Sequence, residues 1–481
     1  MKIANLDYLG IVAGIIDEMG IVEEINTRIG RSSREKVSAG IIVKAMILNG
    51  LGFVSAPLYM FSKFFEGKPT EHLLGEGITA EQINDDRLGN VLDDLQEAGL
   101  SETFLGISLR AVTQYEVKVE IGHLDSTSFH VDGEYSKEEE GSIEITHGYS
   151  RDHRPDLKQF MMNLICVGDG DIPVMMEVVS GNQADKARFA GLLQEFKEQW
   201  TFEGICVADA ALYSEENLIA MTGLKWLTRV PLSIKAASEL VETTTGLQSS
   251  KFKGYTTTES VSEYGGVSQR WILVESQERR KSDIKKLDKK IEQIQQNCHQ
   301  ELQTLAGQDF ACVADAIAAA EKLSAKMKWH QLSHIQTLEK KHYAKRGKPK
   351  PDAIPTSISY RITAMVIPID SEILAQRQRC GRFILATNIL DSLQFTADDA
   401  LREYKAQQGT ERGFRFLKDP LFFTSSVFLK SAKRIEALGM IMVLCITVIA
   451  TFIANVELLA KHFSLTLAKK MCAIYSYCCI I

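Results

Sequence analysis

Paired cysteines and an amino-terminal apolar leader are the first features that this sequence lacks. Its nine cysteines include no C-x-x-C pair and have no nearby histidine at metal-ligand spacing. A disulfide framework is not expected in a chain of 481 residues, so we predict reduced thiols in a cytosolic compartment. The apolar run Tyr8–Ile16 is short and is followed at once by Asp17 and Glu18, so we expect no signal peptide.

An excess of positive charge is also missing. The formal net charge is −7, which argues weakly against nucleic-acid binding because domains that bind nucleic acids are usually basic. The charge is spread unevenly, however, and the stretches Lys340–Lys350 and Arg412–Arg434 are both basic. Because a local basic patch can bind phosphate whatever the total charge, a nucleic-acid partner stays possible.

A single long apolar run stands out, Ala437–Val456, which contains no charged residue. It reaches the length of about 18 residues that a membrane span requires. Polar residues and a glycine dilute it, namely Gly439, Thr447, Thr451 and Asn455. A helix buried on all sides in a large domain has the same composition, and we predict this rather than a membrane anchor.

Residues 1–115 are predicted to form an all-helical domain. Apolar residues recur at helical spacing in four segments, namely Tyr8–Met19, Ile41–Leu51, Arg87–Leu95 and Phe104–Val112. A domain of this kind is either a helix-turn-helix reader of DNA or a dimerisation module. Basic residues grouped in one loop favour contact with phosphate, with a solvated loop as the alternative; they are Arg28, Arg31, Arg34 and Lys36.

From Val119 the sequence takes on the pattern of strands. Asp125 lies within the first strand, in H-L-D-S-T-S-F-H-V. The predicted elements that follow are the hairpin strands Phe160–Val167 and Ile172–Val179, a helix over 185–200, the buried strand Gly204–Ala208, a helix over 214–221 and the strand Trp226–Val230.

This order of three strands, helix, strand, helix and strand is that of a ribonuclease-H-like domain. We therefore predict a ribonuclease-H-like mixed sheet with helices, of the α+β or α/β class, over residues 116–230. In that arrangement the first and fourth strands are neighbours. Asp125, in the first strand, and Asp209, at the tip of the fourth, would then meet at the edge of the sheet where ligands collect.

Residues 231–380 are predicted to interrupt this fold as an insertion domain, and the core resumes over 381–460. Heptad spacing over 284–298 and helical spacing over 311–338 predict a long charged helical hairpin. The basic segment 345–351 is interpreted as a linker. Two elements mark the return of the core, the strand Arg382–Thr387 and the helix Thr396–Lys405.

The stretch Tyr404–Lys418 has the charges expected of a site that holds a metal and binds phosphate. On a helix, Glu411, Arg415 and Lys418 share one face, because residues three or four positions apart are neighbours there. One carboxylate flanked by these cations and by Arg412 suits both tasks. Phe414 and Leu417 lie beside them and would hold this helix to a core. The alternative is a solvated amphipathic helix.

Asp125, Asp209 and Glu411 offer carboxylate oxygens, which are hard ligands suited to Mg²⁺ or Mn²⁺ rather than Zn²⁺. Two such ions about 3.5–4 Å apart activate a water or a 3′-hydroxyl and stabilise the leaving oxygen of a phosphodiester. Other residues keep two interpretations. The group His147, Asp152, His153 and Arg154 either contacts DNA or caps a loop, and Trp226 and Trp271 either stack on a base or, as we prefer, pack in the core.

These motifs together resemble the DDE transposases of bacterial insertion sequences, in the branch with a Y-(2)-R-(3)-E-(6)-K signature. The signature positions are Tyr404, Gln407, Glu411 and Lys418, and the aspartates stand in H-L-D-S-T (Asp125) and V-A-D-A-A-L-Y-S (Asp209). The segments 148–160, 180–185 and 412–420 are similar to one subgroup of these elements, and the resemblance covers about residues 1–455.

The resemblance implies that Asp125, Asp209 and Glu411 form a metal-binding triad for two Mg²⁺ or Mn²⁺ ions. It also implies that Tyr404 and Lys418 hold phosphates of the transposon end. Gln407 departs from the signature arginine, and a neutral amide cannot form a bidentate ionic fork with phosphate. The charge would then come from another cation, for which the sequence offers Arg412 and Arg415.

The activity implied is cleavage at the terminal inverted repeats of an insertion sequence, followed by strand transfer into target DNA. The implied partners are double-stranded DNA and a second copy of the chain, and no membrane is expected. The implied location is the cytoplasm, at the nucleoid. The tail 461–481 is apolar and rich in cysteine, unlike the polar end usual in the family. A catalytically decayed copy that acts only as a DNA-binding protein is therefore the alternative.

Overall fold

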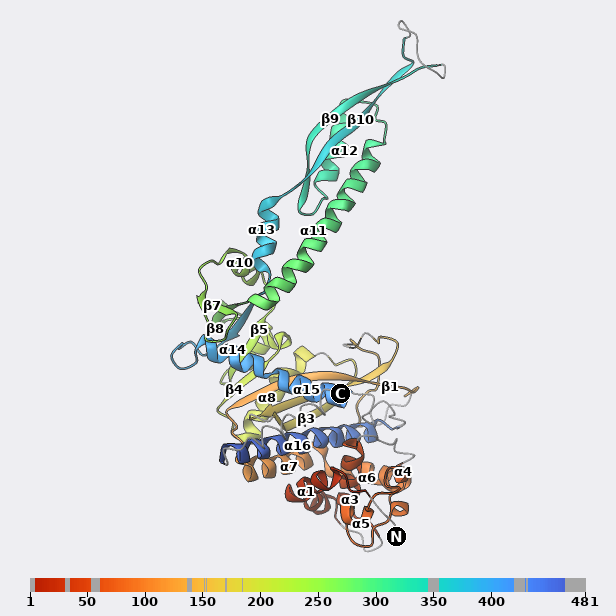
Figure 1. The fold of residues 1–481 in the computed structure, drawn as a ribbon, viewed down its shortest axis with the longest axis vertical. Coiled ribbons are helices and arrows are strands. Elements are labelled where there is room, and N and C mark those ends of the chain that lie inside the picture. Colours follow the sequence, from red (N-terminus) through yellow and green to blue (C-terminus); the bar gives the residue numbers. More distant parts are fainter. Residues whose placement is uncertain are drawn as a thin grey trace. The chain divides into compact units, whose positions relative to one another are not determined.

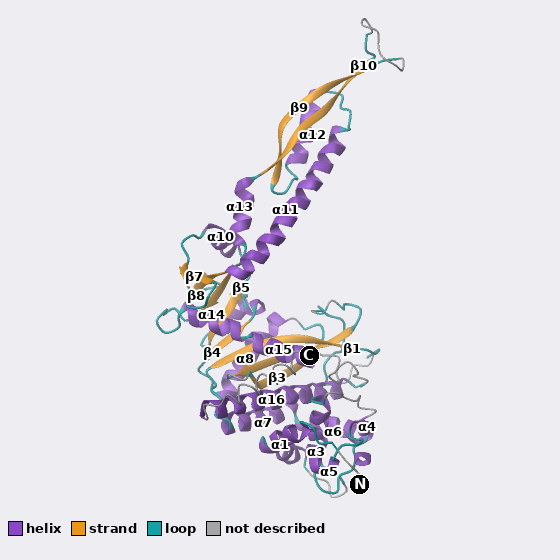
Figure 2. Ribbon diagram, in the orientation of Figure 1, coloured by secondary structure: helices purple, strands orange, loops and turns teal. Residues whose placement is uncertain are grey.

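The chain forms two compact units in the computed structural model, and each is described by itself. The first comprises Met1–Arg229, Val261–Arg270 and Ala386–Ile481, and the second comprises Val230–Ser260 and Trp271–Leu385. Figure 1 traces the chain and Figure 2 its helices and strands. The structure describes residues 5–30, 35–52, 61–135, 141–150, 152, 154–168, 171–183, 185–344, 354–418, 429 and 431–462.

Helices alone make up the described part of residues 1–115, as the apolar spacing predicted. They are α1 (Leu9–Glu18), α2 (Ile21–Ile29), α3 (Ala39–Gly50), α4 (Phe61–Phe64), α5 (Thr70–Leu74), α6 (Asp85–Ala98) and α7 (Leu100–Gln114), with the short 3₁₀ helix η2 (Ala80–Gln82). The start of α6 shows the local cause. Asn84 accepts a hydrogen bond from the backbone N–H of Arg87, and Asp85 and Asp86 place negative charge in the first turn.

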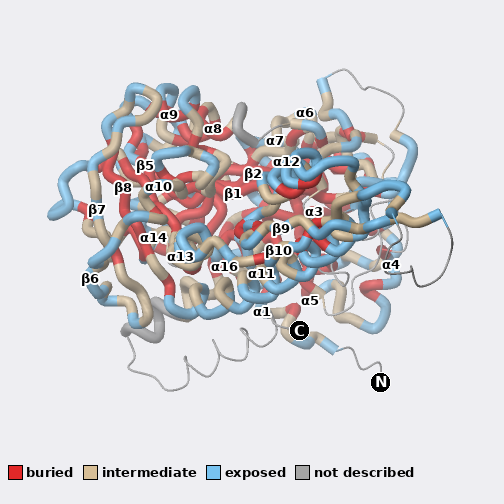
Figure 3. The backbone as a smooth tube through the Cα atoms, turned by 90° about the horizontal axis from the view of Figure 1, so that it is seen from above, coloured by how far each residue is buried: buried red, intermediate tan, exposed pale blue. Residues whose placement is uncertain are grey.

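A mixed sheet forms the centre of the first unit, with the strand order β3-β2-β1-β4-β5. Its strands are β1 (Ile121–Val131), β2 (Lys158–Val167), β3 (Ile172–Ser180), β4 (Ile205–Ala208) and β5 (Lys225–Val230). β1 pairs antiparallel with β2 and parallel with β4, and β4 pairs parallel with β5. The predicted ribonuclease-H-like mixed sheet is confirmed. Figure 3 shows β1 and β2 in the colour of buried residues.

Helices connect and cover these strands. α8 (Asp185–Trp200) precedes β4, and the 3₁₀ helix η3 (Ala210–Leu212) and α9 (Glu215–Ala220) follow it. Ser214 caps α9 by accepting from the N–H of Asn217. After the insertion the core continues with α14 (Ala397–Ala406) and α15 (Gln408–Leu417).

The long apolar run forms α16 (Ala432–His462), which lies between the sheet and the amino-terminal helices (Figure 1). It contacts β3 on one side and α3, α6 and α7 on the other. The segment Ala432–Val456 is long and apolar enough to cross a membrane by composition, but 78% of its most apolar window is buried inside the protein. A helix enclosed by protein on several sides is apolar all round, so its composition fits a core helix.

The second unit contains α10 (Lys235–Thr243), α11 (Gln277–Ala306), α12 (Val313–Ser324), α13 (Asp370–Arg379) and a two-stranded antiparallel sheet of β9 (His330–His342) and β10 (Ser357–Pro368). The short strand β6 (Gln248–Ser249) pairs with β7 (Tyr255–Tyr264). β8 (Val267–Ser276) and β11 (Arg382–Thr387) complete the strands of the insertion region.

The predicted helical hairpin of the insertion is wrong from His330 onward. α11 matches its first half, but the second helix ends at Ser324, and His330–His342 is a strand. One face of the β9–β10 sheet packs with α11 and α12 in a small core that includes Cys298, Leu302 and Leu332. The predicted linker 345–351 lies outside the described residues.

Candidate active site

The two aspartates predicted for the site lie on neighbouring strands of the first unit. Leu124 of β1 pairs with Ala208 of β4, and Ala208 pairs with Thr228 of β5. Asp125 immediately follows Leu124, and Asp209 immediately follows Ala208. Because neighbouring strands are about 4.8 Å apart, the two carboxylates start from adjacent backbone positions.

Hydrogen bonds to the backbone orient both aspartates. An Asp125 carboxylate oxygen accepts from the N–H of Ser126 at 2.8 Å, and an Asp209 carboxylate oxygen accepts from the N–H of Ala211 at 2.8 Å. The latter bond caps η3, so the turn after β4 holds the side chain in place. The backbone carbonyl of Asp209 also accepts from the hydroxyl of Thr228 at 2.6 Å, which ties the tip of β4 to β5.

Tyr404 brings the carboxyl-terminal part of the chain to this edge of the sheet. It lies on α14, whose start is fixed by a capping box between Thr396 and Asp399. The phenol hydroxyl is hydrogen-bonded to the Arg229 side chain. Burial raises the pKa of Tyr404, Arg229 opposes that rise, and the charges of Asp209 and Glu411 add to it. The phenol is therefore neutral at physiological pH, within electrostatic range of two of the three predicted carboxylates.

Gln407 is buried, with 6% of its surface exposed. Its side-chain N–H donates to the backbone carbonyl of Leu124 at 3.1 Å. Because Leu124 immediately precedes Asp125, this bond fastens the junction of α14 and α15 to the strand that carries the first aspartate. The structure thus engages the amide of Gln407 with the protein backbone.

α15 has one buried and one exposed face. Phe414 and Leu417 are buried and hold the helix to the core, as predicted, while Glu411, Arg412 and Arg415 are exposed. Gly409 allows the helix to start close to the β2–β3 turn, because a Cβ at this position would collide with the Asp171 carboxylate. The Arg412 guanidinium lies 4.0 Å from the same carboxylate.

Lys418, at the end of α15, lies further along β1. Its ammonium group is 2.7 Å from an Asp152 carboxylate oxygen and 5.8 Å from the ring centre of Phe129. His130 completes the group, with Nδ1 3.6 Å from Asp152 and Nε2 2.9 Å from the Ser150 hydroxyl. Burial lowers the pKa of His130, and Asp152 opposes this shift.

The remaining candidates separate into surface and core residues. Arg154 pairs with Asp156 at 2.8 Å, His147 is exposed, and His153 lies outside the described residues. Trp226 and Trp271 are 1% and 3% exposed, as the core interpretation predicted.

Two residues near the aspartates were not predicted. Arg229 follows Thr228 on β5 and so stands level with Asp209. His123, two residues before Asp125, is buried, and burial lowers its pKa to about 4. The signal for Arg229 was present as a charge that follows the apolar residues of a strand, in W-L-T-R-V.

The donors at this edge suit a hard divalent cation, because Asp125 and Asp209 present carboxylate oxygens from adjacent strands. Glu411 belongs to α15, which contacts β1. Within the described ranges, no three His, Cys, Asp or Glu side chains lie close enough to hold one metal ion together. The aspartate pair therefore fits such an ion, and Glu411 is not part of a compact three-residue cluster.

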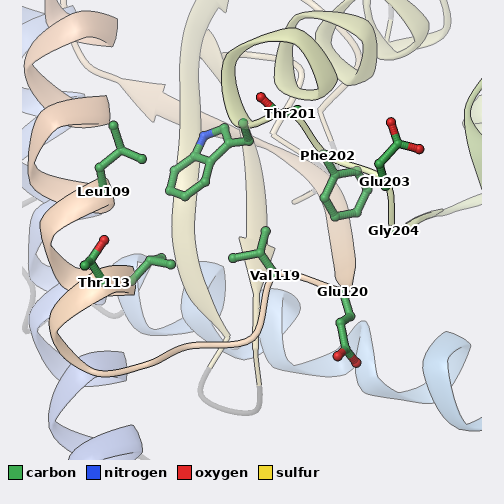
Figure 4. Close-up of a pocket in the computed structure, with 10 residues that line it drawn as sticks. Leu109, Thr113, Val119, Glu120, Thr201, Phe202, Glu203 and Gly204 are labelled. Carbon is green, nitrogen blue, oxygen red and sulfur yellow. The ribbon is translucent and has the colours of Figure 1, made fainter.

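A separate cavity of about 510 Å³ lies near the starts of β1 and β4 (Figure 4). It is lined by Leu109 and Thr113 of α7, by Val119 and Glu120, and by the turn 200–204. Asp125 lies within β1 and Asp209 just after the end of β4, and neither lines this cavity, which is therefore distinct from the aspartate site.

The fold and the paired aspartates place the chain in the ribonuclease-H-like class. Sequence comparison then gives the family. Residues 120–448 match the family described as the transposase DDE domain, and residues 1–109 match a domain of unknown function, DUF4277. Because the first match covers more than half of the chain, the protein belongs to the DDE transposase family.

Two further comparisons are limited. No curated protein sequence matches the chain. A solved structure described as the piggyBac transposase synaptic complex with hairpin DNA is similar with a TM-score of 0.37 and 12% identity, over 94% of this chain and 74% of that chain. A similarity this low carries no argument about the present protein.

Proposed function

We propose that this protein is the transposase of a bacterial insertion sequence, from the branch with the Y-R-E-K signature. It would cut at the terminal inverted repeats and join the freed ends to target DNA. The observation that supports this most is the level placement of Asp125 and Asp209 on neighbouring parallel strands. Tyr404 lies on α14, and the charges of Asp209 and Glu411 both raise the pKa of its phenol. This effect supports a position of α14 close to the aspartates.

Asp125, Asp209 and Glu411 are the residues proposed to hold two Mg²⁺ or Mn²⁺ ions. When bound, such ions lower the pKa of a water or hydroxyl nucleophile and stabilise the charge on the leaving oxygen. The backbone N–H groups of Ser126 and Ala211 keep the two aspartates oriented for this task. The hydrogen bond from Gln407 to β1 fixes the junction of α14 and α15. It thereby fixes the start of α15, the helix that carries Glu411.

The proposed reaction has two phosphoryl-transfer steps. In the first, the oxygen of a water bonds to phosphorus while the bond from phosphorus to O3′ breaks, which leaves a 3′-hydroxyl on the element and a 5′-phosphate on the flanking DNA. In the second, this 3′-hydroxyl attacks a target phosphodiester and releases a target 3′-hydroxyl. Positioning and charge stabilisation supply most of the catalysis in such reactions. Arg412, Arg415 and Lys418 are proposed to bind the backbone phosphates.

The proposed partners are double-stranded DNA, as inverted repeats and as target, and a second copy of the chain on paired ends. The proposed location is the cytoplasm, at the nucleoid. We assign recognition of the transposon ends to the helical region 1–115. Residues 116–230 and 381–460 are the two parts of the proposed catalytic core, and 231–380 are the insertion domain between them. Residues 461–481 are an atypical tail. Residues 463–481 of that tail lie outside the described residues.

A nicking assay tests the proposal. The substrate is a plasmid that carries the gene together with the DNA on both sides, where the terminal repeats would lie. We expect wild type with Mg²⁺ to nick this DNA at two mapped positions, and Asp209→Asn to lose at least about a hundredfold in rate, because one carboxylate ligand is gone. Asp315→Asn, the same change at an exposed position on α12, serves as the matched control and should nick normally.

Equal nicking by wild type and Asp209→Asn would show that the assigned acidic residues are wrong. The alternative function, a decayed copy that only binds DNA, predicts a different result. Wild type would then shift the end fragments in a gel without nicking them at any divalent-ion concentration. The atypical tail is the sequence feature that favours this alternative.

A further inference from the structure

The two-stranded ribbon of β9 and β10 in the second unit has one covered face and one open face. α11 and α12 pack against the covered face, where Ile362 joins the small core. Because side chains alternate along a strand, the neighbouring positions point away from that core. On this open face Leu338, which is 55% exposed, pairs with Arg361. Gln336 pairs with Thr363, and both are exposed.

The open face carries hydrogen-bond donors and positive charge. Its polar strand positions include Gln336, Lys340, His342, Ser359, Arg361 and Thr363. The one acidic residue of the two strands, Glu339, pairs with Tyr360, which packs against the small core on the other face. The basic stretch Lys340–Lys350 of the sequence begins on β9. Such a surface is complementary to DNA, because the backbone of DNA is anionic and its groove edges are rich in acceptors.

Asp309 holds the guanidinium of Arg361 on this face. Phe310 forms a β-bridge with Tyr360, so Asp309 stands beside Arg361 at the edge of β10. The Asp309 carboxylate accepts from Nε of Arg361 at 2.5 Å and from Nζ of Lys340 at 2.8 Å. Within the described part of the chain, no hydrogen bond engages the two terminal nitrogens of the guanidinium. The Arg361 side chain is 38% exposed, so it is held through Nε while its terminal nitrogens stay available to a ligand.

We propose that the open face of the β9–β10 ribbon enters the major groove of the transposon-end DNA and that Arg361 reads a guanine there. This inference rests on the proposed transposase function and adds a second reader to the helical region 1–115. The major groove is about 12 Å wide and admits a two-stranded β-ribbon. Two parallel N–H groups of a guanidinium match the O6 and N7 acceptors of guanine. Because Asp309 already holds Nε, less side-chain freedom is lost when the terminal nitrogens bind the base.

The test measures base discrimination at single positions of the DNA. The end sequence is first located by the footprint of the full-length protein on the plasmid used for nicking. A duplex with this sequence is then compared with duplexes in which one G·C pair at a time is changed to A·T. Binding is measured at several salt concentrations in EDTA, so that cutting does not interfere. For wild type, at least one change should weaken binding by roughly five- to 150-fold, the range of one bidentate base contact.

Arg361→Ala should lose the discrimination at one such position and keep it at the others, with a nearly unchanged slope of log affinity against log salt. Arg361→Lys should recover only part of the discrimination, because it keeps the charge without the planar fork. Arg377→Ala is the matched control. The Arg377 guanidinium also pairs with an aspartate, Asp288, and its side chain is 42% exposed, but it lies on α13. Thermal melting of each variant checks that the fold is kept.

The outcomes separate the role of Arg361 from the transposase function. If wild type nicks DNA and no position loses its discrimination in Arg361→Ala, the ribbon does not read bases through this residue and the transposase function stands. If Arg361→Ala instead weakens binding to all duplexes equally and lowers the salt slope, Arg361 contacts a phosphate and the base-reading proposal fails. A wild type that neither nicks nor binds the ends removes the transposase function and this inference with it.

Discussion

Asp152 pairs with the ammonium group of Lys418, one of the cations proposed to bind DNA. The two groups are 2.7 Å apart, and their side chains are 42% and 24% exposed. An ion pair this exposed contributes little to stability, on the order of 0.2–1 kcal/mol. A DNA phosphate can therefore displace Asp152 at small cost, but the competing carboxylate lowers the affinity.

We predict that Asp152→Asn raises the affinity for end-containing DNA by about two- to fivefold, the equilibrium equivalent of that pair energy. Lys418→Ala should weaken binding. The double variant is the control: adding Asp152→Asn to Lys418→Ala should bring no gain if the effect runs through the ammonium group. Filter binding at fixed salt measures all four proteins. An equal gain in both backgrounds would assign the effect to general charge removal instead.

At the scale of elements, the charge cluster around Asp309 joins the turn after α11 to the β9–β10 sheet. One carboxylate oxygen is 2.5 Å from Nε of Arg361, and the other is 2.8 Å from Nζ of Lys340. The hydrogen bond from Arg361, then that from Lys340, lowers the pKa of Asp309 to about 2. Protonation of this carboxyl would remove the negative charge to which both strands donate.

A lowered folded-state pKa means that the stabilisation is present above the unfolded-state value of 3.8 and is lost as the pH falls toward about 2. We predict that Asp309→Asn lowers the Tm of the full chain at about pH 5 and that this difference from wild type shrinks as the pH approaches 2. Thermal unfolding of the full chain, followed by circular dichroism across this range, measures it. A difference that is constant with pH would contradict the linkage.

Most elements of the first unit could be predicted from sequence, because their periodicity is local. Helical spacing marked α1, α3, α6 and α7. At the end of the insertion region, β11 was likewise predicted with the bounds that the structure has, Arg382–Thr387. α15 was expected from the three- and four-residue spacing of its charges. These signals depend on residues within one element, so no knowledge of partners was needed.

β9 shows where this reasoning fails. Leu332 and Ile335 are three residues apart, which is a helical spacing, and yet both join the core beneath the strand. His334 between them has φ 52°, and the pairing with β10 shifts register opposite this point. Such a bulge inserts one extra residue into the strand. The spacing between successive residues that face the core therefore changes here from two to three. The bulge and the pairing with 357–368 are not local, so the apolar spacing alone predicted a helix.

At the scale of the whole molecule, Glu436 fixes the position of α16 in the first unit. It is 9% exposed. One carboxylate oxygen accepts from the Gln96 side chain of α6 at 3.0 Å, and the other accepts from the backbone N–H of Ile143 at 2.7 Å. One side chain therefore joins the helical region, the loop after β1 and the core helix.

We predict that Glu436→Ala destabilises the protein by about 2–3 kcal/mol, because both partners lose a charged acceptor in a partly buried place. Glu436→Gln should cost less, since its amide oxygen still accepts from Ile143. The Tm of the full chain compares the two with wild type. Equal losses for both variants would show that the charge, rather than the acceptor oxygen at Ile143, provides the stability.

The sequence by itself determined the family, the elements of the core and the acidic and signature residues that motif order identifies. These follow from spacing along the chain, and spacing is all that a sequence displays. Only the tertiary structure decided that the Gln407 amide serves the backbone of β1, that Arg229 bonds to Tyr404 and that Asp152 pairs with Lys418. The physical reason is that a side chain's electrostatic partners are chosen by distance in space, and strand pairing brings together residues far apart in the sequence.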